Sequence, residues 1–147
     1  GQFMPSSWTA YAVDGDADGI VDLFHSRRDA IFSVANFLKV HGWEQGKATR
    51  VHVEIQHADN LKELLEPDIV PTFTPATMQS KGIKLGTPTL ADEKLALIEL
   101  VRGEKEPTYI AGGQNFFVVT RYNRSSFYAN AVLELSEALK FRKATLN

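Results

Sequence analysis

The chain has 147 residues and a formal net charge of −2, and its 44% share of hydrophobic residues is ordinary for a soluble globular protein. This length suits one domain, or one domain with a small insertion, and the near-neutral charge gives no electrostatic reason to expect nucleic acid or an anionic membrane surface as a partner. The chain has no cysteine, which excludes disulfides and thiolate metal sites, and no apolar run is long enough to span a membrane.

The first predicted element is a short aromatic segment at residues 2–13. Proline is tolerated in the first turn of a helix, so Pro5 and the serines after it predict a short helical turn. The segment also carries Phe3, Trp8 and Tyr11. These rings are either plain core residues or the floor of a sugar site, because the C–H faces of pyranoses stack on aromatic rings. Spacing alone favours the core.

An acidic loop follows, in which Asp14, Asp16 and Asp18 stand at alternate positions and precede Gly19. This pattern is typical of the first half of a helix–loop–helix calcium loop, where the glycine supplies a sharp turn. Carboxylates crowded in this way repel one another, and a hard cation that prefers oxygen ligands removes the repulsion. The alternative is an acidic, glycine-rich surface turn that binds no metal.

The second half of the loop departs from the calcium pattern. The carbonyl of Ile20 is placed to be the next ligand, and the side chains of Ile20 and Leu23 are expected to anchor the loop to the core. A loop of about twelve residues would end on a bidentate Glu, but His25 occupies that position. We therefore expect a lengthened loop that is closed by Asp29, the nearest later carboxylate.

A helix is predicted for residues 28–41, with Ser26 as its N-cap and Gly42 as its C-cap. Asp29 suits its first turn. Apolar residues recur along it at helical spacing, and they predict an amphipathic helix. These residues are Ile31, Val34, Ala35 and Leu38.

The middle of the chain predicts a small antiparallel sheet inserted between helical parts. Alternation or apolar runs indicate strands at 51–55, 94–101 and 108–110. Short helices are predicted at 60–65 and after Thr74, which precedes a proline and suits an N-cap.

Two further elements are predicted near the C-terminus. Residues 115–120 are rich in β-branched and aromatic side chains, so propensity alone favours a strand. Residues 126–143 predict a second amphipathic helix. Its apolar positions are Tyr128, Ala131, Val132, Leu135 and Leu139.

Several segments, in this order, resemble the C-terminal part of the B-type lytic murein transglycosylases, bacterial enzymes that cut peptidoglycan. The resemblance covers both ends of the chain well and residues 45–110 poorly. The segments are GQFMPSS at 1–7, the acidic loop at 14–22, DAIFSVAN at 29–36 with HGW at 41–43, and NFFVVTRYN at 115–123 followed by SFYA at 126–129.

The resemblance implies an α+β fold with a mainly helical, lysozyme-like core and a small inserted antiparallel β-subdomain. It implies a division into 1–44 (core with the calcium loop), 45–111 (the insertion) and 112–147 (helices returning to the core). It also makes residues 116–122 helical, against their propensity. The activity implied is cleavage of the β-1,4 bond between N-acetylmuramic acid and N-acetylglucosamine, with a 1,6-anhydro product.

The resemblance also assigns roles to single residues. The acid/base Glu of the family lies upstream of the segment that matches Gln2, so we expect the chain to be a fragment that is inactive alone. The implied calcium ligands are Asp14, Asp16, Asp18, the Ile20 carbonyl and Asp29. The implied glycan cleft is lined by Gln2, Phe3, Met4, Phe37, Tyr122, Asn123 and Tyr128, with Gln2 held against the two tyrosines.

The implied partners are peptidoglycan glycan strands and the N-terminal part of the same protein, with no nucleic acid. The implied location is the bacterial periplasm, with anchoring to the outer membrane through a missing N-terminal segment left open. An alternative of another class is a non-catalytic, calcium-dependent module that binds glycan or a protein. A calcium sensor is disfavoured because the chain has only one loop of this kind, and only the first half of that loop matches the calcium pattern.

Overall fold

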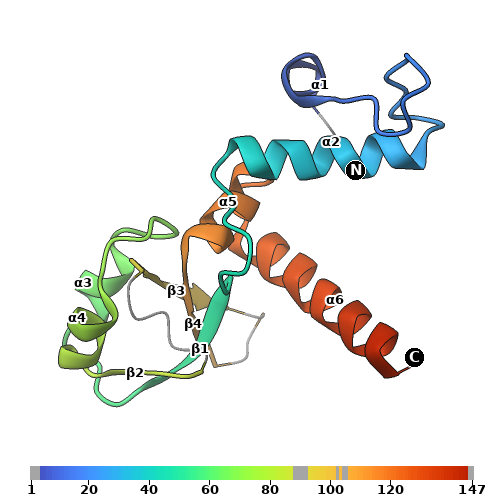
Figure 1. The fold of residues 1–147 in the computed structure, drawn as a ribbon. Coiled ribbons are helices and arrows are strands. Elements are labelled where there is room, and N and C mark those ends of the chain that lie inside the picture. The colour runs from blue at the N-terminus through green and yellow to red at the C-terminus, as the bar shows by residue number, and fades with distance from the viewer. Residues whose placement is uncertain (1–3, 88–92, 102, 104–105, 146–147) are drawn as a thin grey trace. The chain divides into compact units, whose positions relative to one another are not determined.

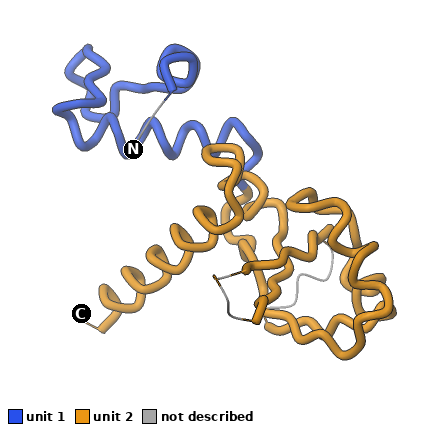
Figure 2. The backbone as a smooth tube through the Cα atoms, turned by 180° about the vertical axis from the view of Figure 1, so that it is seen from behind, with its two compact units in different colours: residues 1–43 blue, residues 44–147 orange. Residues whose placement is uncertain are grey.

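The computed structural model describes residues 4–87, 93–101, 103 and 106–145 (Figure 1). The chain divides into two compact units, residues 1–43 and residues 44–147 (Figure 2). The three-part division predicted from the resemblance remains a prediction. None of the described helices is both long and apolar enough to cross a membrane.

The first unit consists of two helices joined by the acidic loop. The helix α1 (Pro5–Tyr11) begins at Pro5, where the missing N–H costs nothing because first-turn N–H groups have no partner within the helix. The helix α2 (Arg27–Val40) begins after Ser26, whose hydroxyl accepts the N–H of Asp29 at 3.2 Å. The predicted N-cap is therefore confirmed.

The face of α2 that packs on the α1 segment is polar as well as aromatic. The Ser33 hydroxyl accepts the N–H of Val13 at 2.9 Å, and the Asn36 amide donates to the Tyr11 carbonyl at 2.9 Å. The Tyr11 ring meets Phe37 edge-on, with centroids 5.1 Å apart. Hydrogen bonds thus satisfy polar groups at this contact while the aromatic pair supplies apolar burial.

The apolar positions predicted to mark the core face of α2 do not form its buried face. Ile31 is 67% exposed and Ala35 is exposed, while Val34 and Leu38 are only half-buried. The buried residues of α2 are instead Asp29, Ser33 and Phe37.

The second unit is built on a four-stranded antiparallel sheet of order β2-β1-β4-β3. Ala111 pairs with Val51 on one side and Leu97 on the other, and all three are buried in the core of the sheet. The strands are β1 (Arg50–Ile55), β2 (Ile83–Leu85), β3 (Ala96–Leu100) and β4 (Thr108–Gly112). The predicted antiparallel sheet is confirmed. Sequence periodicity missed β2 because three residues are too few to show alternation.

Two short helices complete the core of the sheet. α3 (Leu61–Leu65) contributes Leu64, and α4 (Pro75–Ser80) contributes Met78, both fully buried. The hydroxyl of Thr74 accepts the N–H of Thr77 at 3.1 Å, so the predicted N-cap is confirmed.

Helices α5 (Gln114–Tyr122) and α6 (Ser126–Thr145) follow the sheet directly. The strand that propensity favours at 115–120 is wrong, because burial of Phe116 and Val118 on a helix outweighs a weak intrinsic preference. The tight passage from β4 into α5 depends on Gly112, where a Cβ would lie 2.8 Å from Ile98 and 3.0 Å from Phe116.

The predicted extent of α6 is confirmed, but its predicted apolar side is exposed. Val132, Leu135 and Leu139 all face solvent. The residues that α6 buries are Ala129, Asn130 and Leu133. Both long helices therefore carry exposed apolar residues.

Candidate functional site

The acidic loop brings three carboxylates together. One oxygen each from Asp14, Asp16 and Asp18 lies within 4.8 Å of the others. The loop turns through left-handed backbone at Ala17 (φ 63°) and Gly19 (φ 92°). The Asp14 carboxylate accepts the N–H groups of Ala17 at 2.7 Å and Gly19 at 2.8 Å, which orders the turn.

Asp29 closes this loop by hydrogen bonding. It is 1% exposed, and its two oxygens accept the N–H groups of Gly15 and Asp22, both at 2.8 Å. The bond from Asp22 is the chief reason that the pKa of Asp29 lies below its ordinary value of 3.8, and burial opposes it. Gly15 is required at this contact, because a Cβ there would lie 2.8 Å from the Arg28 carbonyl.

Ser26 connects the carboxylate cluster of the acidic loop to α2. Its hydroxyl donates to Asp16 at 2.6 Å and accepts the N–H of Asp29 at 3.2 Å. The arrangement offers hard oxygen donors on a loop that is ordered by hydrogen bonds, which is the donor set that calcium prefers. Asp14, Asp16 and Asp18 would hold the ion, and Asp29 would fix the loop around it.

Asp22 is a loop residue that the sequence reasoning passed over. Its carboxylate accepts the N–H groups of Phe24 and His25, both at 2.9 Å, and contacts the His25 ring at 2.9 Å. The hydrogen bond from the His25 backbone is the largest cause of its lowered pKa. Asp22 continues the alternate spacing that begins at Asp14, and this spacing could have identified it as a loop carboxylate. The predicted anchoring by Ile20 is wrong, since that side chain is 66% exposed, and Leu23 is half-buried.

In the second unit, the junction of α5 and α6 brings two predicted glycan-site residues together. Tyr122 is half-buried at the end of α5, and Tyr128 is exposed in the first turn of α6. Burial raises the pKa of the Tyr122 hydroxyl above its ordinary 10.0, and the nearby Tyr128 raises it further. Asn123 follows Tyr122 in the chain and is exposed and in extended backbone. The result is a polar and aromatic corner that can offer both stacking faces and hydroxyls.

Residues 1–137 of the chain match the model of the transglycosylase SLT domain family. The chain belongs to this family. Membrane-bound lytic murein transglycosylase B of Escherichia coli K12 is 35% identical to this SLT-domain chain over 139 residues, which are 95% of the chain. The chain spans only 37% of the length of that relative.

Solved structures of lytic transglycosylases share the fold of this SLT-domain chain. The Escherichia coli enzyme Slt35 in complex with calcium has a TM-score of 0.78 and 32% identity, and the match covers 97% of this chain and 44% of that one. Pseudomonas aeruginosa SltB3 in complex with NAG-NAM-pentapeptide has a TM-score of 0.79 and 31% identity, covering 95% and 37%. The predicted α+β class with a mainly helical, lysozyme-like fold is confirmed.

The remaining predicted residues are placed as follows. Met4 is exposed at the start of α1. Phe37 is 5% exposed, and its ring stacks on His41 with centroids 4.0 Å apart and meets Tyr11 edge-on. Gln2 and Phe3 lie outside the described residues. The roles assigned to these residues in the glycan cleft remain predictions.

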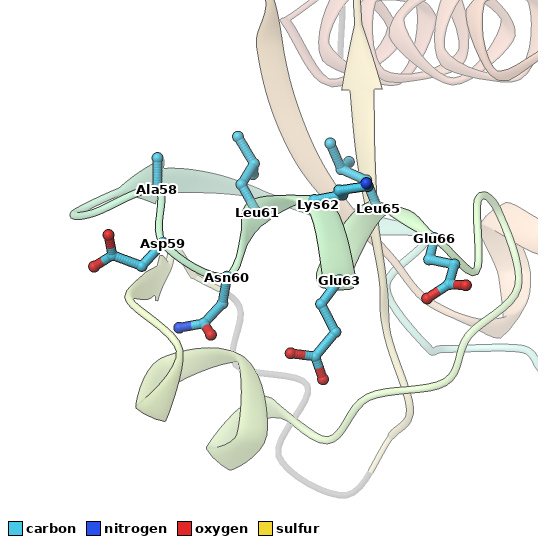
Figure 3. Close-up of a pocket in the computed structure, with 8 residues that line it drawn as sticks. All are labelled: Ala58, Asp59, Asn60, Leu61, Lys62, Glu63, Leu65 and Glu66. Atoms are coloured by element: carbon cyan, nitrogen blue, oxygen red, sulfur yellow. The ribbon is translucent and has the colours of Figure 1, made fainter.

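An open pocket of about 940 Å³ runs along residues 58–66 at α3 (Figure 3). The carboxylates of Asp59, Glu63 and Glu66 stand apart and do not converge (Figure 3). Glu63 is instead paired with Lys81 at 2.7 Å. This pocket therefore offers no converging acid and base. The candidate site residues are those of the acidic loop and of the junction between α5 and α6.

Proposed function

We propose that this chain is the glycan-binding and calcium-binding part of a peptidoglycan lytic transglycosylase. The parent enzyme would cut the β-1,4 bond between N-acetylmuramic acid and N-acetylglucosamine and leave a 1,6-anhydro end. The observation that carries the proposal is the corner formed by Tyr122 and Tyr128 within the residues that match the family. The solved relative that holds NAG-NAM-pentapeptide supports a glycan as the ligand.

The corner is suited to a sugar for a physical reason. A pyranose presents apolar C–H faces and hydroxyl edges, and tyrosine presents a ring and a hydroxyl. Tyr128 is open to solvent, while Tyr122 is held more deeply and Asn123 adds an amide within the same turn of chain. We propose that Tyr128 stacks on the sugar and that Tyr122 and Asn123 bond its polar groups.

We also propose that the acidic loop binds calcium through Asp14, Asp16, Asp18 and the Ile20 carbonyl, with Asp29 closing the loop. The clustered oxygens and the calcium in the Slt35 structure support this. Trp8 lies in α1 of the first unit, so its fluorescence, recorded in a Trp43→Phe background, follows the melting of that unit. Calcium at about a hundred times its dissociation constant should stabilise it by ~2.7 kcal/mol, and Asp16→Ala should abolish the shift.

The uncovered apolar residues of α2 and α6 favour the N-terminal part of the same protein as a partner. Ile31 on α2 and Leu135 and Leu139 on α6 are each more than half exposed. The chain accounts for only 37% of the length of its curated relative, so much of that relative lies outside the match. We propose that upstream helices cover these faces, because burial of apolar area stabilises such contacts.

The chain alone is proposed to bind glycan without cutting it. Family chemistry needs a Glu with a raised pKa, and that Glu is expected upstream of Gln2. Glu54, in contrast, has its pKa lowered by a hydrogen bond from Lys84. The test is to incubate the chain with purified murein sacculi. Binding without release of anhydro-muropeptides is expected, whereas release of these products would show that the acid lies within the chain.

The proposed location is the bacterial periplasm, where murein lies. The curated relative is named as membrane-bound, which supports anchoring of the parent through a segment outside the match. Fractionation of cells that express the full reading frame tests this proposal, and recovery in the cytoplasm would contradict it.

A further inference from the structure

A single buried amide holds the start of α5. Asn115 is 1% exposed. Its side-chain oxygen accepts the N–H of Glu44 at 2.8 Å, and its NH₂ group donates to the carbonyls of Glu44 at 2.7 Å and Lys47 at 3.1 Å. One side chain thus satisfies three backbone groups of a segment about seventy residues away in sequence, a typical use of a buried amide.

The held segment is where the chain enters the second unit, since Glu44 is the first residue of that unit. A backbone bond from Gly113 to the Thr49 carbonyl at 3.0 Å adds a contact beside the amide. No side chain caps the N-terminus of α5. The side-chain hydrogen bonds that link this helix end to Glu44 and Lys47 come from Asn115.

We propose that Asn115 is a positioning residue for the glycan corner, an inference that rests on the proposed function. α5 is a short rigid helix with Phe116, Val118, Val119 and Thr120 buried along it. Its far end carries Tyr122 and Asn123. A shift or rotation at the Asn115 end is transmitted along the helix to these residues, because so short a helix moves as one body.

Two substitutions separate hydrogen bonding from space filling. Asn115→Asp keeps the shape but turns a carboxylate oxygen toward the Glu44 and Lys47 carbonyls, which removes two donors and adds repulsion. Asn115→Ala removes all three bonds and leaves a small cavity. If Asn115 acts through its hydrogen bonds, the Asp variant should be at least as impaired as the Ala variant. If Asn115 only fills space, the Asp variant should behave like the unchanged chain.

The matched control is Asn130→Ala. Asn130 is also a buried amide, but its NH₂ group donates to the Glu134 carboxylate within α6 at 2.8 Å. This variant tests whether loss of any buried amide in the second unit has the same effect.

Trp43 precedes the held segment and supplies a local probe. In a Trp8→Phe background, acrylamide quenching of Trp43 and the affinity for a soluble GlcNAc–MurNAc tetrasaccharide are measured well below the melting temperature. We expect both Asn115 variants to raise quenching and to weaken glycan binding about tenfold with unchanged far-UV circular dichroism. The control should match the unchanged chain in both readouts.

Normal quenching in both Asn115 variants, or raised quenching with normal glycan affinity, would overturn the inference. An Asp variant that behaves like the unchanged chain would overturn it too. Failure of the proposed function is a distinct result, since the unchanged chain would then bind no tetrasaccharide while the quenching comparison still reported on the amide.

Discussion

The carboxylate of Asp29 accepts the backbone N–H of Gly15 at 2.8 Å, across a sequence separation of 14 residues. Its other oxygen accepts the N–H of Asp22, so one side chain of α2 ties both limbs of the acidic loop. The hydrogen bonds of Asp29 therefore order the loop, in addition to any ion that the loop binds.

Asp29→Asn should weaken the first unit and reduce its sensitivity to acid. The pKa of Asp29 is lowered in the folded state, so its contribution is complete above the ordinary value of 3.8 and is lost as pH falls through the lower folded value. Melting followed by tryptophan fluorescence from neutral pH to strong acid should show a shallower acid loss in the variant. Asp68→Asn, at an exposed position in the second unit, is the control. Equal acid slopes in all three chains would contradict this role.

Ser26→Ala should destabilise the first unit by about 1 kcal/mol, the usual cost of losing an N-cap. It should also weaken calcium binding, because Asp16 loses the hydroxyl that holds it at 2.6 Å. Calorimetric titration with calcium and tryptophan-detected melting measure the two effects. Thr74→Ala removes an N-cap from α4 and should leave calcium affinity unchanged. A calcium affinity that is the same in Ser26→Ala and the unchanged chain would refute the link.

Glu137→Gln should destabilise the second unit through Arg50. The guanidinium of Arg50 makes paired bonds to Glu137 at 2.9 and 3.1 Å, and its side chain is only 7% exposed. Glu137 is 61% exposed, so solvent screening reduces the loss to about 1–2 kcal/mol. Denaturant unfolding followed by far-UV circular dichroism measures it. Glu54→Gln, which breaks the exposed pair with Lys84, should cost less. An equal cost would show that the burial of Arg50 is unimportant.

Tyr122 should titrate above the ordinary tyrosine value of 10.0, because burial and the nearby Tyr128 both disfavour its charged form. Tyrosinate absorbance on raising the pH should contain a late phase to which Tyr109 also contributes, and Tyr122→Phe should reduce its amplitude. Tyr128→Phe should move that phase to lower pH. The same late phase in the Tyr122 variant would assign it to another tyrosine, such as Tyr109, whose pKa burial also raises.

Local rules predicted two N-caps, whereas the C-cap of α2 is His41 and the predicted Gly42 follows it in left-handed backbone. Ser26 and Thr74 are read correctly as caps because capping depends on a few adjacent residues. The family resemblance predicts the helix at α5 and the β-branched residues do not, because burial of Phe116 and Val118 on a helix decides its conformation.

Sequence periodicity did not identify the buried faces of α2 and α6, and it could not predict contacts between residues far apart in the chain. Helical spacing predicts that the apolar rows of α2 and α6 face the core, yet Ile31 and Leu135 are exposed. The contacts of Asn115 with Glu44 and Lys47 have no local signature, because they join residues about seventy positions apart. The ligand role that the resemblance implies for Asp29 stays a prediction, and its bonds to backbone N–H groups could not be predicted because they depend on how the loop folds back.

The most direct test of the account is a backbone chemical-shift titration of the isotope-labelled chain with a soluble GlcNAc–MurNAc tetrasaccharide. The account predicts that the largest shifts fall on Tyr122, Asn123 and Tyr128, and that they disappear in a Tyr122→Phe/Tyr128→Ala double variant that remains folded. Shifts centred on residues 58–66 at α3, or none at all at millimolar ligand, would contradict the assignment of the α5–α6 corner as the glycan site.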